Sequence, residues 1–325
     1  MAHIPRVYER VIKESSSPET WRDFSYAHTV TGREIARIDQ FSSTQVSSRY
    51  WSQSPTNVLH LPQNKFEELL RRELRIPILS GGAASHLEVS EKKVNFRIHG
   101  GDSPAEVSCD YLLAADGANS AVREALRIPM EGISDLHTMI NVHFRCSLSP
   151  IRLLPRPAML YFIFNETAVC VFVAHDPAAH EWVAQIPIFP PFQSQSDFEQ
   201  GNVAETLIRK CMGLKADEEV NILSIRTWRM HAEVAQRFSN AHNNCFLIGD
   251  SAHRFPPAGG LGMNTGIADA HNIVWKLARA VDKKGGAAAL LTTYHSERHP
   301  VAKANTELSL RNYQRTVAVA SAVYL

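Results

Sequence analysis

The chain has 325 residues, of which 44% are hydrophobic and 21% are charged. These are the proportions of a globular protein with room for one large or two medium domains, and they exclude a disordered tail. The 34 Lys and Arg residues and the 33 Asp and Glu residues leave a formal net charge of +1 without a long run of one sign, so nothing indicates a nucleic-acid or anionic-membrane partner.

The cysteines and the two ends of the chain suggest where the protein works. The five cysteines form no C-x-x-C pair, so we expect reduced thiols, mostly in the core of a soluble intracellular protein. The apolar stretch VAVASAVYL at the end is much shorter than the about 20 residues that a membrane span needs, and the start has no signal-peptide pattern. We therefore expect no transmembrane segment, while cytoplasm and organelle both stay open.

The first part of the chain is polar and poorly periodic up to LHLPQNKFEELLRREL. Phe66, Leu69, Leu70 and Leu74 follow helical spacing there, and Asn64 is the predicted cap of that helix. Short strands are predicted next in IPILS, SHLEVS and KVNFRIH. The segment EVSCDYLLAADGANSAVREAL is typical of a strand, a tight turn and a helix, which is the unit of an α/β sheet.

The pattern changes from about residue 129. The segments MINVHFRCSL, AMLYFIFN, TAVCVFVAH and WVAQIPIF indicate an antiparallel sheet with one buried face, hence a second domain. A helix near 197–212 and a strand near 219–229 lead to NCFLIGD, a buried strand of the parallel type. Helices are predicted at 264–281 and 287–316. The predicted domains are therefore 1–128, 129–235 and 236–325, with the first and last forming one α/β domain.

The segment CFLIGDSAHRFPPAGGLGMNTG carries the chemistry. Asp250 follows a strand, at the end of an α/β sheet where ligands bind and where a carboxylate accepts hydrogen bonds from sugar hydroxyls. Gly259, Gly260 and Gly262 expose backbone N–H groups, and the helix start that follows attracts phosphate. A simple cap of the next turn is the alternative role for Asp250. The glycine spacing in GLGMNTG is not the dinucleotide fingerprint, because it is one residue too long and too far from its strand.

Three other interpretations stay open. The GDSAH segment contains Ser251 and His253, which raises the possibility of a Gly-Asp-Ser serine esterase. A metal site from His253, His271, Asp250 and Asp269 is a second possibility, although no metal is the expectation. A non-catalytic binding or scaffold protein is the third. In ERHP, Glu297 and Arg298 form either an ion pair that tethers the last helix or a solvated helix face.

The motifs also resemble a known family. The stretch GDSAHRFPPAGGLGMNTGIADAHNIVWKLA resembles the Gly-Asp motif of the FAD-dependent aromatic hydroxylases, the para-hydroxybenzoate hydroxylase-like monooxygenases. The stretch DYLLAADGANSAVREAL resembles their Asp-Gly motif, and the order and separation of the two also match. SPTNVLHLPQNKFEELL, YFIFNETAVCVFVAHD and YHSERHPVA are similar to the phenol-hydroxylase-like branch, so the resemblance covers nearly the whole chain.

The resemblance implies a mixed α/β fold, in which a Rossmann-like FAD-binding domain is interrupted by an antiparallel substrate-domain sheet. It implies FAD as cofactor and NAD(P)H as reductant, with O2 captured as a flavin C4a-hydroperoxide and one oxygen passed to a phenolic or other aromatic substrate. Two family features are missing: the N-terminal G-x-G-x-x-G unit of about 30 residues and a C-terminal extension. A truncated, non-catalytic family member is therefore the alternative, and the oligomeric state stays unknown.

The resemblance also implies roles for single residues. Asp250 holds the ribose or ribitol hydroxyls, the backbone of Gly262 and Met263 lies near the flavin N1–C2=O edge, and the carbonyl of Pro257 lies over the flavin as the one catalytic group. Asp116 and Gly117 serve FAD and the approach of NAD(P)H. The full set of implied cofactor-binding residues is Gln63, Asp116, Gly117, Gly249, Asp250, Pro257, Ala258, Gly259, Gly260, Leu261, Gly262, Met263 and Asn264.

Overall fold

The computed structural model describes residues 5–16, 21–40, 58–100, 104–148, 157–188, 193–199, 202–282 and 287–323. The chain forms two compact units. Unit 1 consists of Met1–Pro77 and His137–Trp228, and unit 2 of Ile78–Leu136 and Arg229–Leu325. Two of the three passages between the units lie inside long strands, β7 (Met130–Cys146) and β11 (Val220–Ala235).

The units group the chain differently from the predicted domains. Residues 1–77 belong to the same unit as 137–228, whereas the sequence-based division placed 1–128 together with 236–325. The division into compact units assigns no ligand to either unit. The assignment of an FAD-binding and a substrate domain therefore stays a prediction.

Unit 1 is built on a sheet that follows the strand order β7-β10-β9-β8-β1-β2. All neighbours are antiparallel except β1 and β8, and the strands β9 and β10 alternate between buried and half-buried residues. One face thus carries Phe144, Phe172 and Trp182 into a core shared with α6, as the sequence predicts. The elements are β1 (Asp23–Ala27), β2 (Glu34–Asp39), β8 (Leu160–Phe164), β9 (Val169–Asp176), β10 (Glu181–Pro187), α5 (Gln195–Glu199) and α6 (Val203–Met212).

Two further helices of unit 1 pack against each other. Val7 and Val11 of α1 (Pro5–Glu14) meet Phe66 and Leu69 of α3 (Gln63–Glu73), and all four side chains are buried. The N-cap of α3 is Pro62, whose carbonyl accepts the N–H of Phe66 at 3.0 Å. The prediction that Asn64 caps this helix is therefore wrong. Proline takes the cap because its fixed φ, here −56°, suits a chain entering a helix.

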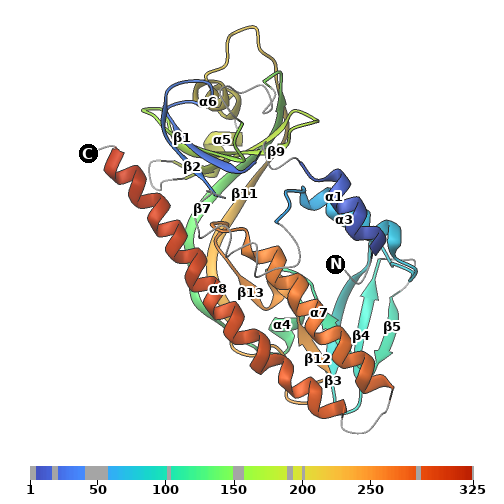
Figure 1. Ribbon diagram of the computed structural model, residues 1–325. Helices are drawn as coiled ribbons and strands as arrows, with labels where there is room; N and C mark the ends of the chain where they lie inside the picture. The colour runs from blue at the N-terminus through green and yellow to red at the C-terminus, as the bar shows by residue number, and fades with distance from the viewer. Residues whose placement is uncertain are drawn as a thin grey trace, which may run out of the picture. The chain divides into compact units, whose positions relative to one another are not determined.

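In unit 2 (Figure 1), the strands predicted before Asp116 and before Asp250 form a parallel pair. Strand β6 (Leu112–Ala114) pairs with β12 (Cys245–Leu247), and Phe238, Phe246 and Ile273 fill the core beside them. A separate antiparallel sheet consists of β3 (Ala83–Val89), β4 (Val94–His99) and β5 (Ala105–Cys109). The remaining elements are α4 (Ala121–Ala125), the 3-10 helix Gly249–Ser251, β13 (His253–Arg254), α7 (Leu261–Val281) and α8 (Ala287–Val323).

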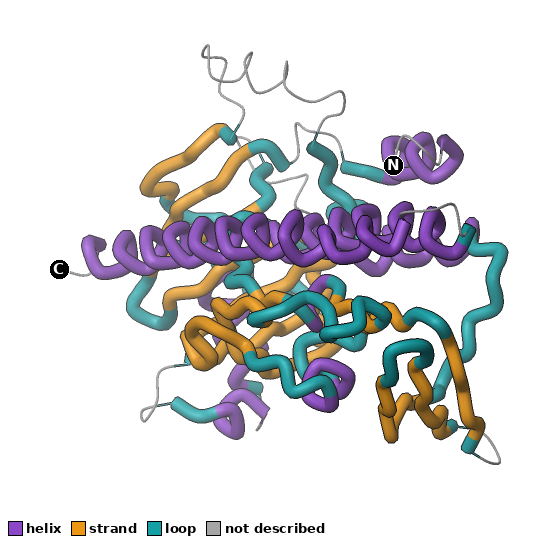
Figure 2. Tube along the Cα trace, turned by 90° about the horizontal axis from the view of Figure 1, so that it is seen from below, coloured by secondary structure: helices purple, strands orange, loops and turns teal. Residues whose placement is uncertain are grey.

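Helices α7 and α8 lie side by side in unit 2, and Figure 2 shows α8 along its whole length. Helix α7 begins three residues before the predicted 264, and α8 extends beyond the predicted 316 with Pro300 inside it. The strand predicted in IPILS is wrong, because Ile76 and Leu79 are 69% and 79% exposed and residues 76–80 form no strand. No helix in the described ranges is long and apolar enough to cross a membrane. All five cysteines are free, and four are buried.

Gly132 marks a close approach between β7 and β11 in unit 2. Its φ is +134°, and a Cβ atom there would lie 2.1 Å from the carbonyl oxygen of Ala232. We expect Gly132→Ala to lower the free energy of unfolding by about 2 to 4 kcal/mol, because the colliding atom belongs to the backbone and cannot move aside. Chemical denaturation measures this.

The matched control is Gly81→Ala in the same unit. Gly81 also has a left-handed φ, +79°, but a Cβ atom there meets nothing within 4 Å. This variant should lose only the about 1 to 2 kcal/mol of a left-handed L-residue. Equal losses in the two variants would contradict the steric explanation.

His60 gives unit 1 a pH-dependent stability. Burial, together with the neighbouring positive charge of His175, lowers the pKa of His60 to about 4. Because this folded pKa lies below the ordinary value of 6.5, the unfolded chain binds more protons between the two values. The contribution is therefore fully present above pH 6.5 and is lost as the pH falls toward 4, by up to about 3 kcal/mol.

We expect His60→Asn to reduce the loss of unfolding free energy between pH 6.5 and 4. His180→Asn is the control, since His180 is exposed and has a φ of +56° that asparagine tolerates. Denaturant titrations at several pH values compare the variants. An unchanged pH profile in His60→Asn would show that His60 does not carry the effect.

Candidate functional site

The parallel pair brings the two acidic residues of the predicted site to one edge of unit 2. Ala114 at the end of β6 is in register with Leu247 at the end of β12. Asp116 lies two residues beyond the first strand and Asp250 three residues beyond the second, and both side chains are exposed. Both carboxylates therefore follow the carboxyl ends of neighbouring parallel strands, the edge at which α/β sheets bind ligands.

Ser251 ties these two strand ends together. Its hydroxyl lies 2.7 Å from the carbonyl oxygen of Ala114 and 2.9 Å from that of Ile248, and it accepts the N–H of Ile248 at 2.9 Å. The side chain is completely buried. A hydroxyl held in this way by backbone groups is not placed to attack an ester, so the structure does not support the esterase alternative.

Two arginines hold the loop after β6. Arg123 donates to the carbonyl oxygen of Ala118 at 3.1 Å and to that of Ser251 at 2.9 Å, and Arg254 also donates to the oxygen of Ala118. Burial and the positive charge of Arg254 lower the pKa of Arg123. Asp116 accepts the N–H of Val122 at 3.0 Å and so supports the start of α4. No local sequence pattern indicates that Arg123 links the two motifs.

The glycines after Asp250 leave the N-terminus of α7 open. A Cβ atom at Gly260 or Gly262 would meet nothing within 4 Å in the described part of the chain. Gly260 is the N-cap with a φ of +62°, and no side chain caps the helix. Because a helix start leaves its first N–H groups unpaired, Leu261, Gly262 and Met263 present backbone donors with partial positive charge.

The remaining predicted residues shape the turn that leads into α7. Pro257 is exposed, and its carbonyl accepts the N–H of Gly260 at 3.1 Å, while Asn264 donates its side-chain N–H to the carbonyl of Gly260 at 2.9 Å. The carbonyl of Ala258 accepts from Asn312 of α8 at 3.5 Å. Gly259 has a φ of +122°, which favours glycine. The proposed role of the Pro257 carbonyl stays a prediction.

Gln63 belongs to unit 1 and lies in the first turn of α3. Its side-chain N–H donates to Glu67 at 3.0 Å, on the exposed side of the helix. Its role toward a cofactor stays a prediction.

Of the four residues of the predicted metal site, the structure brings two together as a pair. His253 and Asp269 are buried and lie 2.7 Å apart, but Asp250 and His271 are exposed. Another group, His143, His175 and Glu181 on one sheet of unit 1, brings its ligand atoms within 4.8 Å of one another.

The carboxylate of that unit 1 group is already paired. Glu181 accepts from Arg145 at 2.5 Å and from His143 at 3.1 Å. Burial by itself would raise the pKa of Glu181, but these hydrogen bonds outweigh it and hold the pKa below its ordinary value. An ion pair therefore accounts for the position of Glu181.

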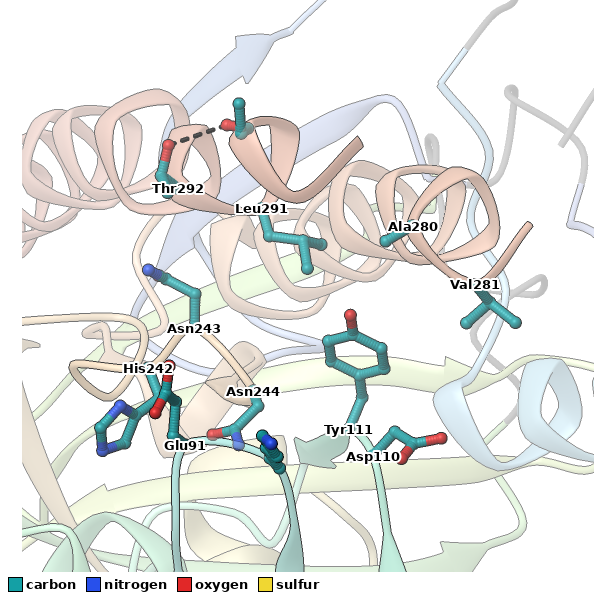
Figure 3. Close-up of a pocket in the computed structure, with 12 residues that line it drawn as sticks. Glu91, Asp110, Tyr111, His242, Asn243, Asn244, Ala280, Val281, Leu291 and Thr292 are labelled. Atoms are coloured by element: carbon teal, nitrogen blue, oxygen red, sulfur yellow. Dashed lines mark hydrogen bonds between the residues drawn. The ribbon is translucent and has the colours of Figure 1, made fainter. Parts of the chain in front are cut away.

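A pocket of about 750 Å³ lies elsewhere in unit 2 (Figure 3). Asp110, Tyr111, Asn243 and Asn244 line it from just before β6 and β12, and the Tyr111 ring points toward the helices that carry Ala280 and Leu291. This pocket is therefore at the amino ends of the strands. The predicted site lies beyond their carboxyl ends and does not share its lining.

The residues at the carboxyl edge fit a dinucleotide such as FAD. Open space at Gly117, Gly260 and Gly262 admits a ligand to the backbone, the uncapped start of α7 offers N–H donors to phosphate, and two exposed carboxylates can accept hydroxyl hydrogens. A set of anion donors beside hydroxyl acceptors suits a molecule that has both a pyrophosphate and sugar chains.

The comparison with protein families agrees with this geometry. The model of the FAD binding domain family matches residues 6–309, and the chain therefore belongs to that family. This confirms the family and the mixed α/β fold class expected from the two motifs. FAD is the cofactor of the family.

Named relatives and a solved structure extend the likeness. The 2,4-dichlorophenol 6-monooxygenase of Delftia acidovorans is 29% identical over 89% of this chain and 50% of its own length. The tetracenomycin B2 monooxygenase-dioxygenase of Streptomyces olivaceus is 31% identical over 81% of this chain and 48% of its own length. The crystal structure of the flavin-dependent monooxygenase PieE in complex with FAD and substrate has a TM-score of 0.87 at 28% identity, covering 98% of this chain and 56% of that one. The chain thus spans about half the length of the relatives that it matches.

Proposed function

We propose that unit 2 binds FAD at the edge where β6 and β12 end, and that the chain acts as an FAD-dependent, NAD(P)H-using monooxygenase on a phenolic or other aromatic substrate. The observation that carries the proposal is the open, uncapped N-terminus of α7, a helix that packs against Gly249–Ser251 through Gly266, together with the exposed Asp250 in a chain of the FAD-binding family. The names of the relatives, which include a dichlorophenol monooxygenase and a tetracenomycin monooxygenase-dioxygenase, support an aromatic substrate.

The proposed roles follow from the donors and acceptors at this edge. Asp250 accepts hydrogen bonds from the ribose or ribitol hydroxyls, and charge makes such bonds stronger than neutral ones. The N–H groups of Leu261, Gly262 and Met263 receive a phosphate or a negative charge that develops on the bound group. Asp116 and Gly117 contact the cofactor from the neighbouring loop. Further proposed contacts in unit 2 are Gly249, Pro257, Ala258, Gly259, Gly260 and Asn264, while the resemblance alone supports a cofactor role for Gln63, which belongs to unit 1.

When bound, FAD would supply the redox chemistry that couples the oxidation of NAD(P)H to the transfer of one oxygen atom of O2 to the ring, with the other leaving as water. The chain contributes binding and orientation. Ser251 and Arg123 fix the two loops to each other, so that the carboxylates and the helix N–H groups keep one arrangement. Such preorganised dipoles stabilise charge without having to reorganise during the reaction.

The experiment has two stages. The chain is mixed with FAD and separated from free flavin by gel filtration, and we expect visible flavin absorbance to elute with the protein. NADH or NADPH is then added with 2,4-dichlorophenol, and substrate-dependent O2 uptake with a hydroxylated product is expected. Protein without flavin would refute the FAD site. Flavin binding without O2 uptake on any phenol tested would instead indicate a flavin-binding protein without monooxygenase activity.

A further inference from the structure

Asp269 is a completely buried carboxylate that meets three segments of unit 2. One oxygen accepts the N–H of Gly249 at 3.3 Å and the Nε2–H of His253 at 2.7 Å, and the other accepts from Nε of Arg298 at 2.7 Å. Asp269 lies on α7 and Arg298 on α8, while Gly249 and His253 bracket the turn after β12. The carboxylate therefore joins both long helices to the turn that carries Asp250.

Burying the Asp269 carboxylate costs free energy that other interactions have to offset. A buried charge is strongly unfavourable unless it is paired and hydrogen-bonded, and here Arg298 supplies the opposite charge. Arg298 also donates to the carbonyl of Thr265 at 3.3 Å, so its planar guanidinium has two fixed partners. The Glu297–Arg298 alternative left open by the sequence is thus resolved for Arg298, which binds Asp269 on α7 and is not a solvated helix residue.

Close packing brings Asp269 within reach of the turn. Gly249 has a φ of +60°, and a Cβ atom at Gly266 would lie 3.1 Å from the Cα atom of Gly249. Two glycines in contact let α7 approach the backbone of the turn. Because glycine has more backbone freedom than any other residue, the hydrogen bond from its N–H to Asp269 limits a peptide that would otherwise be mobile.

We propose that Asp269, oriented by Arg298, is a positioning residue that fixes the peptide before Asp250 and so directs the Asp250 carboxylate toward the cofactor. The inference rests on the proposed FAD site. Because its side chain is completely buried, Asp269 would act through the turn and not by touching the cofactor. Its effect is to remove conformational freedom before binding, which raises affinity by lowering the entropy lost on association.

The test uses Asp269→Asn in the full chain, with two measurements. Hydrogen exchange of the peptide that carries Gly249, in protein without flavin, should become about tenfold faster or more, and the Kd for FAD measured by fluorescence titration should rise by about tenfold or more. Circular dichroism at the same temperature establishes that the variant is folded. Arg298→Lys, which keeps the charge but loses the planar fork, should show the same changes and replaces Asp269→Asn if that variant does not fold.

The matched control is Glu297→Gln, on the neighbouring residue of α8. Glu297 pairs with the buried Lys276 at 2.8 Å and has no contact with the turn, so its loss should lower stability without changing Gly249 exchange or FAD affinity. Lower thermal stability of Asp269→Asn or Arg298→Lys, with Gly249 exchange unchanged and FAD bound as in the unmodified chain, would overturn the inference while leaving the proposed function intact. If the unmodified chain binds no FAD, the proposed function fails, and with it the inference that depends on it.

Discussion

Asp250→Ala is expected to weaken FAD binding about 10- to 100-fold. The carboxylate is exposed just beyond β12, where it can accept hydrogen bonds from ribose or ribitol hydroxyls. Hydrogen bonds to a charged group contribute about 1.5 to 3 kcal/mol each, and every 1.4 kcal/mol is a tenfold change in Kd. Quenching of flavin fluorescence during titration of the chain into FAD gives the two dissociation constants.

The same substitution should cost little stability, because an exposed side chain is removed. Asp282→Ala is the matched control: Asp282 is an exposed aspartate at the other end of α7 in the same unit. It changes the net charge by the same amount without touching the proposed site. If both variants bind FAD as tightly as the unmodified chain, Asp250 does not hold the cofactor and its role is only to cap the turn.

The substitution Gly262→Leu is expected to weaken FAD binding without lowering the stability of the fold. A side chain at this position points into open space, and leucine is the better helix former by up to about 1 kcal/mol, so the free energy of unfolding should stay the same or rise. The leucine would nevertheless occupy the space through which a ligand reaches the N–H groups of the first turn of α7. We expect the Kd for FAD to rise at least about tenfold.

Ala278→Leu is the control for this substitution. Ala278 is exposed near the far end of the same helix, so the added side chain has comparable size and helical context without facing the site. Thermal denaturation and FAD titration are run on both variants. Tight binding in Gly262→Leu would show that no ligand approaches the start of α7, whereas weak binding combined with unfolding would show that the open space is a part of the fold.

The elements that the sequence predicted well are those whose signal is local. Strands β9 and β10 alternate along their length, and the helical spacing of Phe66 and Leu69 places two buried residues on α3. The strand-turn-helix pattern around Asp116 and the buried strand before Gly249 identified β6 and β12, whose parallel pairing then follows from the α/β rules. Each of these elements, though not the pairing of β6 with β12, depends on neighbours in the sequence.

The features that the sequence missed depend on contacts between distant segments. Strands β1 and β2 lie in the stretch described as poorly periodic, because β1 is ordered by β8, more than a hundred residues later in the chain. IPILS has the apolar composition of a strand but acquires no ladder partner in the described structure, since propensity is weak compared with tertiary pairing. The predicted start of α7 is too late because glycines are typical of loops, although the first turn of a helix tolerates them.

The candidate site also combines residues that local motifs indicate with residues whose role depends on contacts between distant segments. The two motifs identified Asp116, Asp250 and the glycines, and the structure brings the carboxylates to one edge of unit 2. The groups that hold this edge, Arg123 and Arg298, could not be assigned, because an arginine that donates to a buried carbonyl or carboxylate has the same local sequence as one in solvent. The opposite end of the strands holds a pocket of about 750 Å³, for which the sequence had no motif.

Hydrogen exchange of the full chain with and without FAD shows whether FAD binds at the edge where β6 and β12 end. Peptides that carry Asp116 and Gly117, and those covering Gly249 to Asn264, should exchange more slowly when FAD is added, while the pocket lined by Tyr111 and Asn243 should be unaffected. Slower exchange at that pocket alone, or no change at residues 249–264 under conditions in which FAD is bound, would show that FAD does not bind at this edge.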